Sequence, residues 1–140
     1  MFDLTHQAID RDAVEAAVRH PSCGAVLVFG GAARNDFEGR EVLELAYEAY
    51  HDMAVAELTR IGDQVSSRWA GARCAIVHRL GVVPIGQDTV VIAVAAPHRA
   101  ECYEASRFAL EQLKARVPIW KKEIYVDGEA WKANDPGLGG

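Results

Sequence analysis

Three stretches of the chain place apolar residues three and four positions apart, the spacing of one helix face. This pattern predicts helices over about residues 11–19, 52–69 and 100–116. Asp10 and Asp52 stand at the expected N-caps, and Pro118 ends the third helix because proline disfavours helical geometry at the residue before it. The side chains expected on buried helix faces are Val14, Ala17, Val18, Ala54, Leu58, Ile61, Val65, Trp69, Tyr103, Phe108, Leu110 and Leu113.

Shorter apolar or alternating runs predict strands at residues 25–29, 42–50, 74–80, 89–96 and 119–126. The run at 25–29 is continuously apolar, which is typical of a strand buried on both faces. A glycine-containing polar loop is expected over 30–39 and a turn over 81–88. Asp127-Gly128 predicts a hairpin that returns through Ala130-Trp131.

The order of these elements indicates the fold class. A helix, two strands, a helix, two strands, a helix and a hairpin follow one another, so the strands arrive in pairs. Paired strands favour an α+β domain with much antiparallel sheet over a doubly wound parallel sheet. A chain of 140 residues is long enough to bury one core. We therefore expect a single domain over residues 1–134 and a flexible tail over 135–140.

Composition narrows the range of partners. The formal net charge of -5 argues against non-specific binding to nucleic acid or acidic membranes, so any anion site is a local basic pocket. Cys23, Cys74 and Cys102 have no metal-ligand spacing and fit a reducing compartment. No secretion signal or membrane-spanning run is visible. We expect a cytoplasmic protein without a bound metal.

Two segments offer chemistry for binding an anion. The loop Gly30–Asp36 contains glycines and Arg34, whose guanidinium can hold an anion, although an ordinary hairpin loop would look the same. His98 and Arg99 stand between a predicted strand and a predicted helix, where free backbone N–H groups favour phosphate or carboxylate. A capping or surface role for His98 is an equal alternative.

Lysine has an unusual distribution along the chain. All four lysines fall in the last 27 residues, while every earlier cationic side chain is arginine. Among other cations a lysine amine can lose its proton and act as a base, which a guanidinium cannot. The favourable interaction of a cation with the helix dipole would by itself explain why Lys114 stands in the last turn.

Beyond Pro118, strand alternation places Ile119 and Lys121 on one side and Trp120 and Lys122 on the other. His78 is expected at a sheet edge.

From these residues alone we expect an α+β domain with a lysine-containing anion pocket. An ordered set of motifs also resembles a known family, the catalytic (large) subunits of molybdopterin synthase, or MoaE family. The resemblance spans roughly residues 24–132. It rests on Gly24-Ala25-Val26 with Gly31, Arg34 and Asn35, on Val77-His78-Arg79-Leu80-Gly81, on His98-Arg99, on Leu113 to Glu123 and on Trp131.

The resemblance implies an α/β hammerhead domain with an additional antiparallel β subdomain, forming a homodimer within a heterotetramer. Each subunit would bind a small ubiquitin-like sulfur carrier, whose C-terminal Gly-Gly thiocarboxylate enters the active site. Sulfur would pass to cyclic pyranopterin monophosphate and form the dithiolene of molybdopterin, with no cofactor required. By resemblance Lys114 and Lys121 are catalytic, and the substrate is bound by Arg34, His98, Arg99 and Lys122.

Some features depart from this family or suggest another function. Ala32 and Ala33 stand where family members often carry a lysine, and Lys132 is the nearest cation that could complete the site across a dimer. A non-catalytic anion- or nucleotide-binding module would use the same pocket. The terminal Gly139-Gly140 raises a third interpretation, in which the chain is itself a sulfur carrier.

Overall fold

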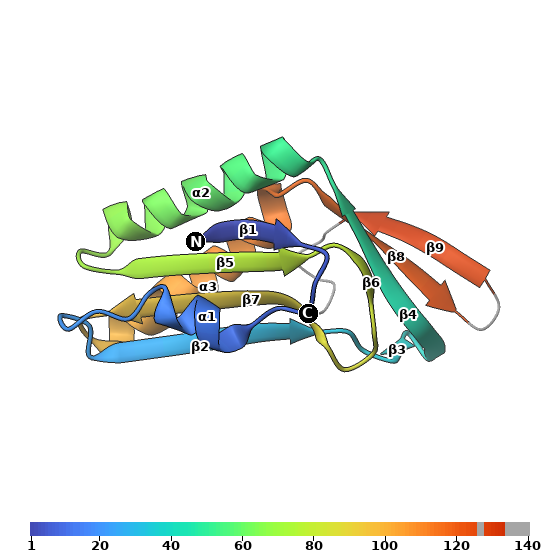
Figure 1. The fold of residues 1–140 in the computed structure, drawn as a ribbon, viewed down its shortest axis with the longest axis horizontal. Coiled ribbons are helices and arrows are strands. Elements are labelled where there is room, and N and C mark those ends of the chain that lie inside the picture. Colours follow the sequence, from blue (N-terminus) through green and yellow to red (C-terminus); the bar gives the residue numbers. More distant parts are fainter. Residues whose placement is uncertain (126–127, 134–140) are drawn as a thin grey trace.

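Two β-sheets form the frame of the molecule in the computed structural model, which describes residues 1–125 and, for the backbone, 128–133 (Figure 1). The first sheet has the order β1-β5-β7-β2. Its strands are β1 (Phe2–Thr5), β5 (Arg73–Arg79), β7 (Asp88–Ala96) and β2 (Ala25–Ala32). β1 runs parallel to β5, and the other two pairings are antiparallel.

The second sheet is antiparallel and stands at one end of the first (Figure 1). It runs β3-β4-β8-β9, with β6 also paired to β4. The strands are β3 (Asp36–Phe37), β4 (Arg40–Ala49), β6 (Gly81–Val83), β8 (Ile119–Tyr125) and β9 (Gly128–Ala133). The predicted α+β class, with an added antiparallel subdomain, is thus confirmed.

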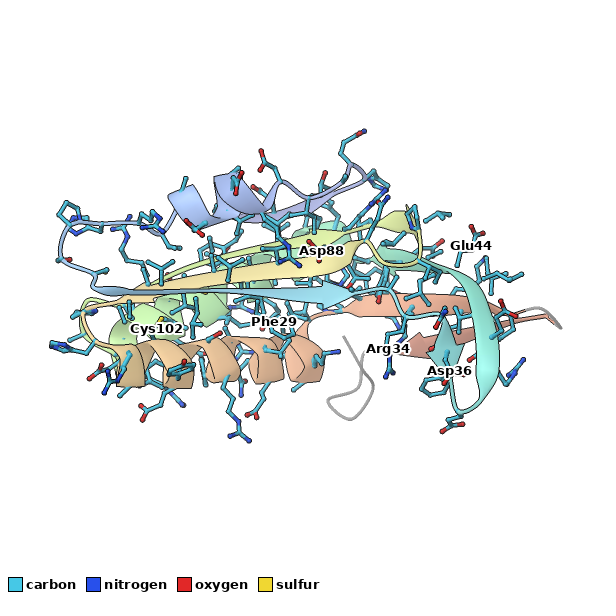
Figure 2. All side chains as sticks on the ribbon, turned by 90° about the horizontal axis from the view of Figure 1, so that it is seen from below. Phe29, Arg34, Asp36, Glu44, Asp88 and Cys102 are labelled. Atoms are coloured by element: carbon cyan, nitrogen blue, oxygen red, sulfur yellow. The ribbon has the colours of Figure 1, made fainter. Side chains whose placement is uncertain are left out.

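Helices cover both faces of the first sheet. Figure 2 shows α1 (Arg11–Ala16) and α3 (Arg99–Arg116) on opposite faces. α2 (His51–Arg68) packs against α3, β1 and β5. The central strand β7 is consequently buried on both faces from Thr89 to Ala96. None of the helices in the described part of the chain is long and apolar enough to cross a membrane.

The helix predictions hold with small shifts at the ends. Asp10 caps α1 by accepting a hydrogen bond from the Ala13 N–H at 3.2 Å. The Asp52 cap is wrong, because α2 begins one residue earlier and Asp52 lies in its first turn. Tyr103 is also not a core residue, since 64% of its surface is exposed.

The strand predictions locate the long strands but misjudge one of them. β2 is a half-buried edge strand, not one buried on both faces, and it extends through Gly30 and Gly31 into the expected loop. β1, β3 and β6 were not predicted. The predicted return of the hairpin is present, since Tyr125 pairs with Gly128, while Asp127 lies outside the described residues. Gly139 and Gly140 also lie outside them.

The packing of α2 on β1 yields a stability prediction at Gly62. A Cβ added there would lie 2.0 Å from Cζ of Phe2. Helix propensity alone predicts that Gly62→Ala gains up to about 1 kcal/mol. We expect the clash to dominate and the free energy of unfolding to fall by about 1–2 kcal/mol, measured by urea denaturation. In a Phe2→Ala background the same substitution should be neutral or stabilising, and equal effects in both backgrounds would contradict the packing argument.

Candidate active site

The turn at Pro118 carries the chain from the end of α3 into the second sheet. Lys114 lies in the last turn of α3, whose C-cap is Val117, and β8 begins at Ile119. β8 then pairs with β4, so that Lys121 lies opposite Tyr47. Because side chains alternate along a strand, Lys121 shares one face of β8 with Ile119, Glu123 and Tyr125. Those three neighbours are buried, so this face points into the molecule.

A pocket opens where the end of the first sheet, the end of α3 and the second sheet meet. Three cationic side chains from separate segments line it: Arg34 after β2, Lys114 on α3 and Lys121 on β8. Figure 2 shows Arg34 beside Asp36, between the end of β2 and the second sheet. The remaining lining residues are Ala32, Asp36, Phe37, Val42, Leu45, Tyr47, His78, Thr89, Val90, Leu113 and Glu123.

A buried carboxylate accompanies the lysine on β8. Lys121 Nζ lies 3.4 Å from Oε1 of Glu123, and the two side chains are only 12% and 2% exposed. The Tyr125 hydroxyl donates a hydrogen bond to Oε2 of the same carboxylate. Burial, followed by contact with Glu123, raises the pKa of Tyr125 to about 12, so the phenol keeps its proton at physiological pH. Lys121 is therefore held in a defined place by an anchored anion.

A neutral imidazole lies at the floor of the pocket. His78 is 2% exposed, and its ring meets that of Tyr47 edge-on with centroids 4.9 Å apart. Burial lowers the pKa of His78 to about 4, and the charge of Lys114 contributes in the same direction. The predicted sheet-edge position is wrong, because β5 lies between β1 and β7.

The other residues assigned by resemblance lie elsewhere in this chain. His98 and Arg99 stand at the opposite end of α3 and line a separate hollow with Gly24 and Pro97. Arg99 is separated from Lys114 by roughly 22 Å along the helix, at 1.5 Å per residue. His98 occupies the N-cap position without a side-chain cap bond. Lys122 lies on the face of β8 opposite to Lys121.

Several pocket residues were not identified from the sequence. Glu123 could have been, because strand alternation places it two residues from Lys121 on the same face. Tyr47 and His78 give no such signal, since only the pairing of distant strands brings them to the pocket. Among the described residues, no three His, Cys, Asp or Glu side chains gather as metal ligands.

The pocket combines functions that suit an anionic reactant. Two amines and a guanidinium can offset negative charge that develops in a transition state. The amines can also donate or accept protons, which the guanidinium cannot. Its geometry therefore fits group transfer between anions.

Comparisons with known proteins agree with this geometry. Residues 4–116 match the family model described as MoaE protein. The human molybdopterin synthase catalytic subunit is 42% identical over 134 residues, which are 96% of this chain and 71% of that protein. Molybdopterin synthase from Staphylococcus aureus has a crystal structure that matches with a TM-score of 0.91 at 40% identity, covering 94% of this chain and 96% of that one.

A more distant structure shares the fold. It is a complex of subunits 1 and 2 of molybdopterin-converting factor from Helicobacter pylori, which matches with a TM-score of 0.75 at 21% identity and covers 92% of this chain and 88% of that one. The human and Staphylococcus aureus proteins match most of the chain at 40% identity or more. These matches rule out the two alternatives, that the chain is a sulfur carrier or a non-catalytic binding module. The chain belongs to the MoaE family, the catalytic subunits of molybdopterin synthase, which are sulfurtransferases of molybdenum cofactor biosynthesis.

Proposed function

We propose that the chain transfers sulfur from the C-terminal thiocarboxylate of a small ubiquitin-like carrier to cyclic pyranopterin monophosphate, forming the dithiolene of molybdopterin. One observation carries the proposal: Arg34, Lys114 and Lys121 converge on one pocket of a chain whose net charge is -5. Because the protein as a whole is acidic, it does not attract anions in general. An anion binds only where the cationic side chains of this pocket gather.

The chemistry of the two reactants matches these side chains. A cyclic phosphate and a thiocarboxylate are both anionic, so cations must offset their repulsion when they meet. Attack by sulfur and opening of the cyclic phosphate both require proton transfers, for which an amine is suited. In this proposal Lys114 and Lys121 are the catalytic residues, and Arg34 binds the anionic group of the substrate.

A second copy of the chain supplies the rest of the site. His98 and Arg99 cannot reach the pocket of their own subunit, because the length of α3 separates them from Lys114. In a homodimer, His98 and Arg99 of one copy lie beside Lys114 and Lys121 of the other and bind the phosphate and pterin. Lys122 stays outside the pocket as a nearby positive charge.

The carrier completes the assembly. The Helicobacter pylori relative is named as a complex of two different subunits. By analogy, two small subunits bind the proposed homodimer, and each inserts its Gly-Gly tail into one pocket. The resulting heterotetramer works in the cytoplasm, for which Cys23, Cys74 and Cys102 are suited as free thiols.

Replacing either pocket lysine tests the catalytic assignment. We expect Lys114→Ala and Lys121→Ala each to reduce dithiolene formation by about 100-fold or more, the usual contribution of a positioned acid or base. The measurement uses purified thiocarboxylated partner and substrate. Arg107→Ala removes an exposed cation from the same helix and serves as the control. Full activity in both lysine variants, with carrier binding retained, would refute the proposal.

Mixing two inactive variants tests the sharing of residues between subunits. In a heterodimer of Lys121→Ala and Arg99→Ala, one pocket lacks both residues and the other is intact if the site is shared. Refolding the two variants together at equal amounts should restore about a quarter of the wild-type activity, because half of the dimers are mixed and each has one good site. If each site used residues of one chain only, no activity would return.

A further inference from the structure

Three polar side chains stand in a row on the inward face of β8. Lys121, Glu123 and Tyr125 occupy alternate positions of the strand, so each is about 7 Å from the next along the backbone. Lys121 and Glu123 line the pocket, whereas Tyr125 does not line it and is only 3% exposed. Tyr125 therefore influences a reaction in the pocket through a neighbour and not by direct contact.

The carboxylate of Glu123 links the two ends of this row. Its Oε1 lies 3.4 Å from Nζ of Lys121, and its Oε2 accepts a hydrogen bond from the hydroxyl of Tyr125. The last torsion of a glutamate side chain is broad when nothing restrains it. Because each oxygen of Glu123 has a partner of its own, rotation of the carboxylate would break both contacts. The phenol thus fixes the orientation of the oxygen that pairs with the amine.

Tyr125 is itself held in place by its surroundings. It pairs with Val42 of β4 on one side and with Gly128 of β9 on the other. The guanidinium of Arg40 lies over its ring, 3.6 Å from the ring centroid. Since two strands fix the backbone and the ring packs under a cation, the hydroxyl is a donor with a defined position.

The phenol anchors the carboxylate without competing for its charge. Burial, followed by the contact with Glu123, raises the pKa of Tyr125 to about 12, so the hydroxyl keeps its proton at physiological pH. An arginine in this place would offset part of the negative charge that attracts the Lys121 ammonium. A neutral donor leaves that charge to the lysine.

We propose that Tyr125 is a positioning residue for Lys121: its hydroxyl fixes the carboxylate of Glu123, and the carboxylate holds the amine in place at the pocket. The inference rests on the proposed function only in taking Lys121 as catalytic. A lysine amine stands on a flexible four-carbon stem. Displacing a catalytic group by about 1 Å can cost about 100-fold in rate. A hydrogen bond two contacts away from the substrate therefore controls the rate.

Removing the hydroxyl alone tests this role. Tyr125→Phe keeps the ring under Arg40 and loses only the donor to Glu123. We expect kcat for dithiolene formation to fall by about tenfold, as a misplaced catalytic group would cause. KM should change little, because Tyr125 does not line the pocket. Tyr103→Phe removes an exposed hydroxyl from α3 and is the matched control. An unchanged kcat in Tyr125→Phe, or a change in KM alone, would contradict the proposal.

A double-mutant cycle separates positioning from packing. Glu123→Gln removes the charge that pairs with Lys121. If the hydroxyl acts through this carboxylate, adding Tyr125→Phe to Glu123→Gln should lower kcat by less than about twofold, since coupled residues are not additive. An equal fall of kcat in the two backgrounds would show that Tyr125 acts independently of Glu123, and the proposed role would be wrong.

NMR of the protein without substrate or carrier tests the same contacts without turnover. We expect the carboxyl carbon of Glu123 and the Nζ of Lys121 both to change resonance in Tyr125→Phe but not in Tyr103→Phe. The proposal is overturned if the Lys121 resonance is the same in Tyr125→Phe as in the wild type. Full activity of Lys121→Ala would instead refute the catalytic role of Lys121, a result on which the NMR measurement does not depend.

Discussion

The antiparallel register between β4 and β8 is the constraint on which the candidate active site depends. It places Lys121 opposite Tyr47 and Glu123 opposite Leu45, with all four side chains at the pocket. A slip of one residue would turn Lys121 and Glu123 outward and bring Trp120 and Lys122 inward. The buried apolar neighbours on the same face, such as Ile119, oppose such a slip. Core packing thereby fixes which lysine of β8 faces the pocket.

The burial of the negatively charged Glu123 is explained by the cations around it. Removing a charge from water costs several kcal/mol, and a buried ion pair often stabilises a protein no more than apolar side chains would. Glu123 nevertheless lies 1% exposed, anchored by Tyr125 and close to Lys121. Without it, Asp36 would be the remaining carboxylate that offsets the charges of Arg34, Lys114 and Lys121 among the residues lining this pocket. Glu123 therefore offsets part of the positive charge that gathers in this pocket.

The sequence predicted the parts of this fold that depend on neighbouring residues. Helical periodicity located α2 and α3, and Pro118 marked the turn between the pocket lysines. It could not predict what depends on pairing between distant segments. His78 and Tyr47 are 31 positions apart in the sequence, and β5 and β4 belong to different sheets. Only tertiary packing brings the two rings together. Local patterns did predict that His98 and Lys114 stand at opposite ends of one helix, although the resemblance assigned both to one site.

That separation along α3 constrains how copies of the chain can share a site. In the proposed homodimer, a two-fold axis perpendicular to α3 near its middle would bring the end with His98 and Arg99 of each copy to the end with Lys114 of the other. The same contact is then made twice, giving two identical sites and leaving no residue unmatched. A head-to-tail arrangement would leave an unmatched helix end at each terminus of the assembly unless it closed into a ring. If residues from the two ends of α3 share a site, as proposed, this geometry therefore favours a closed dimer with two pockets.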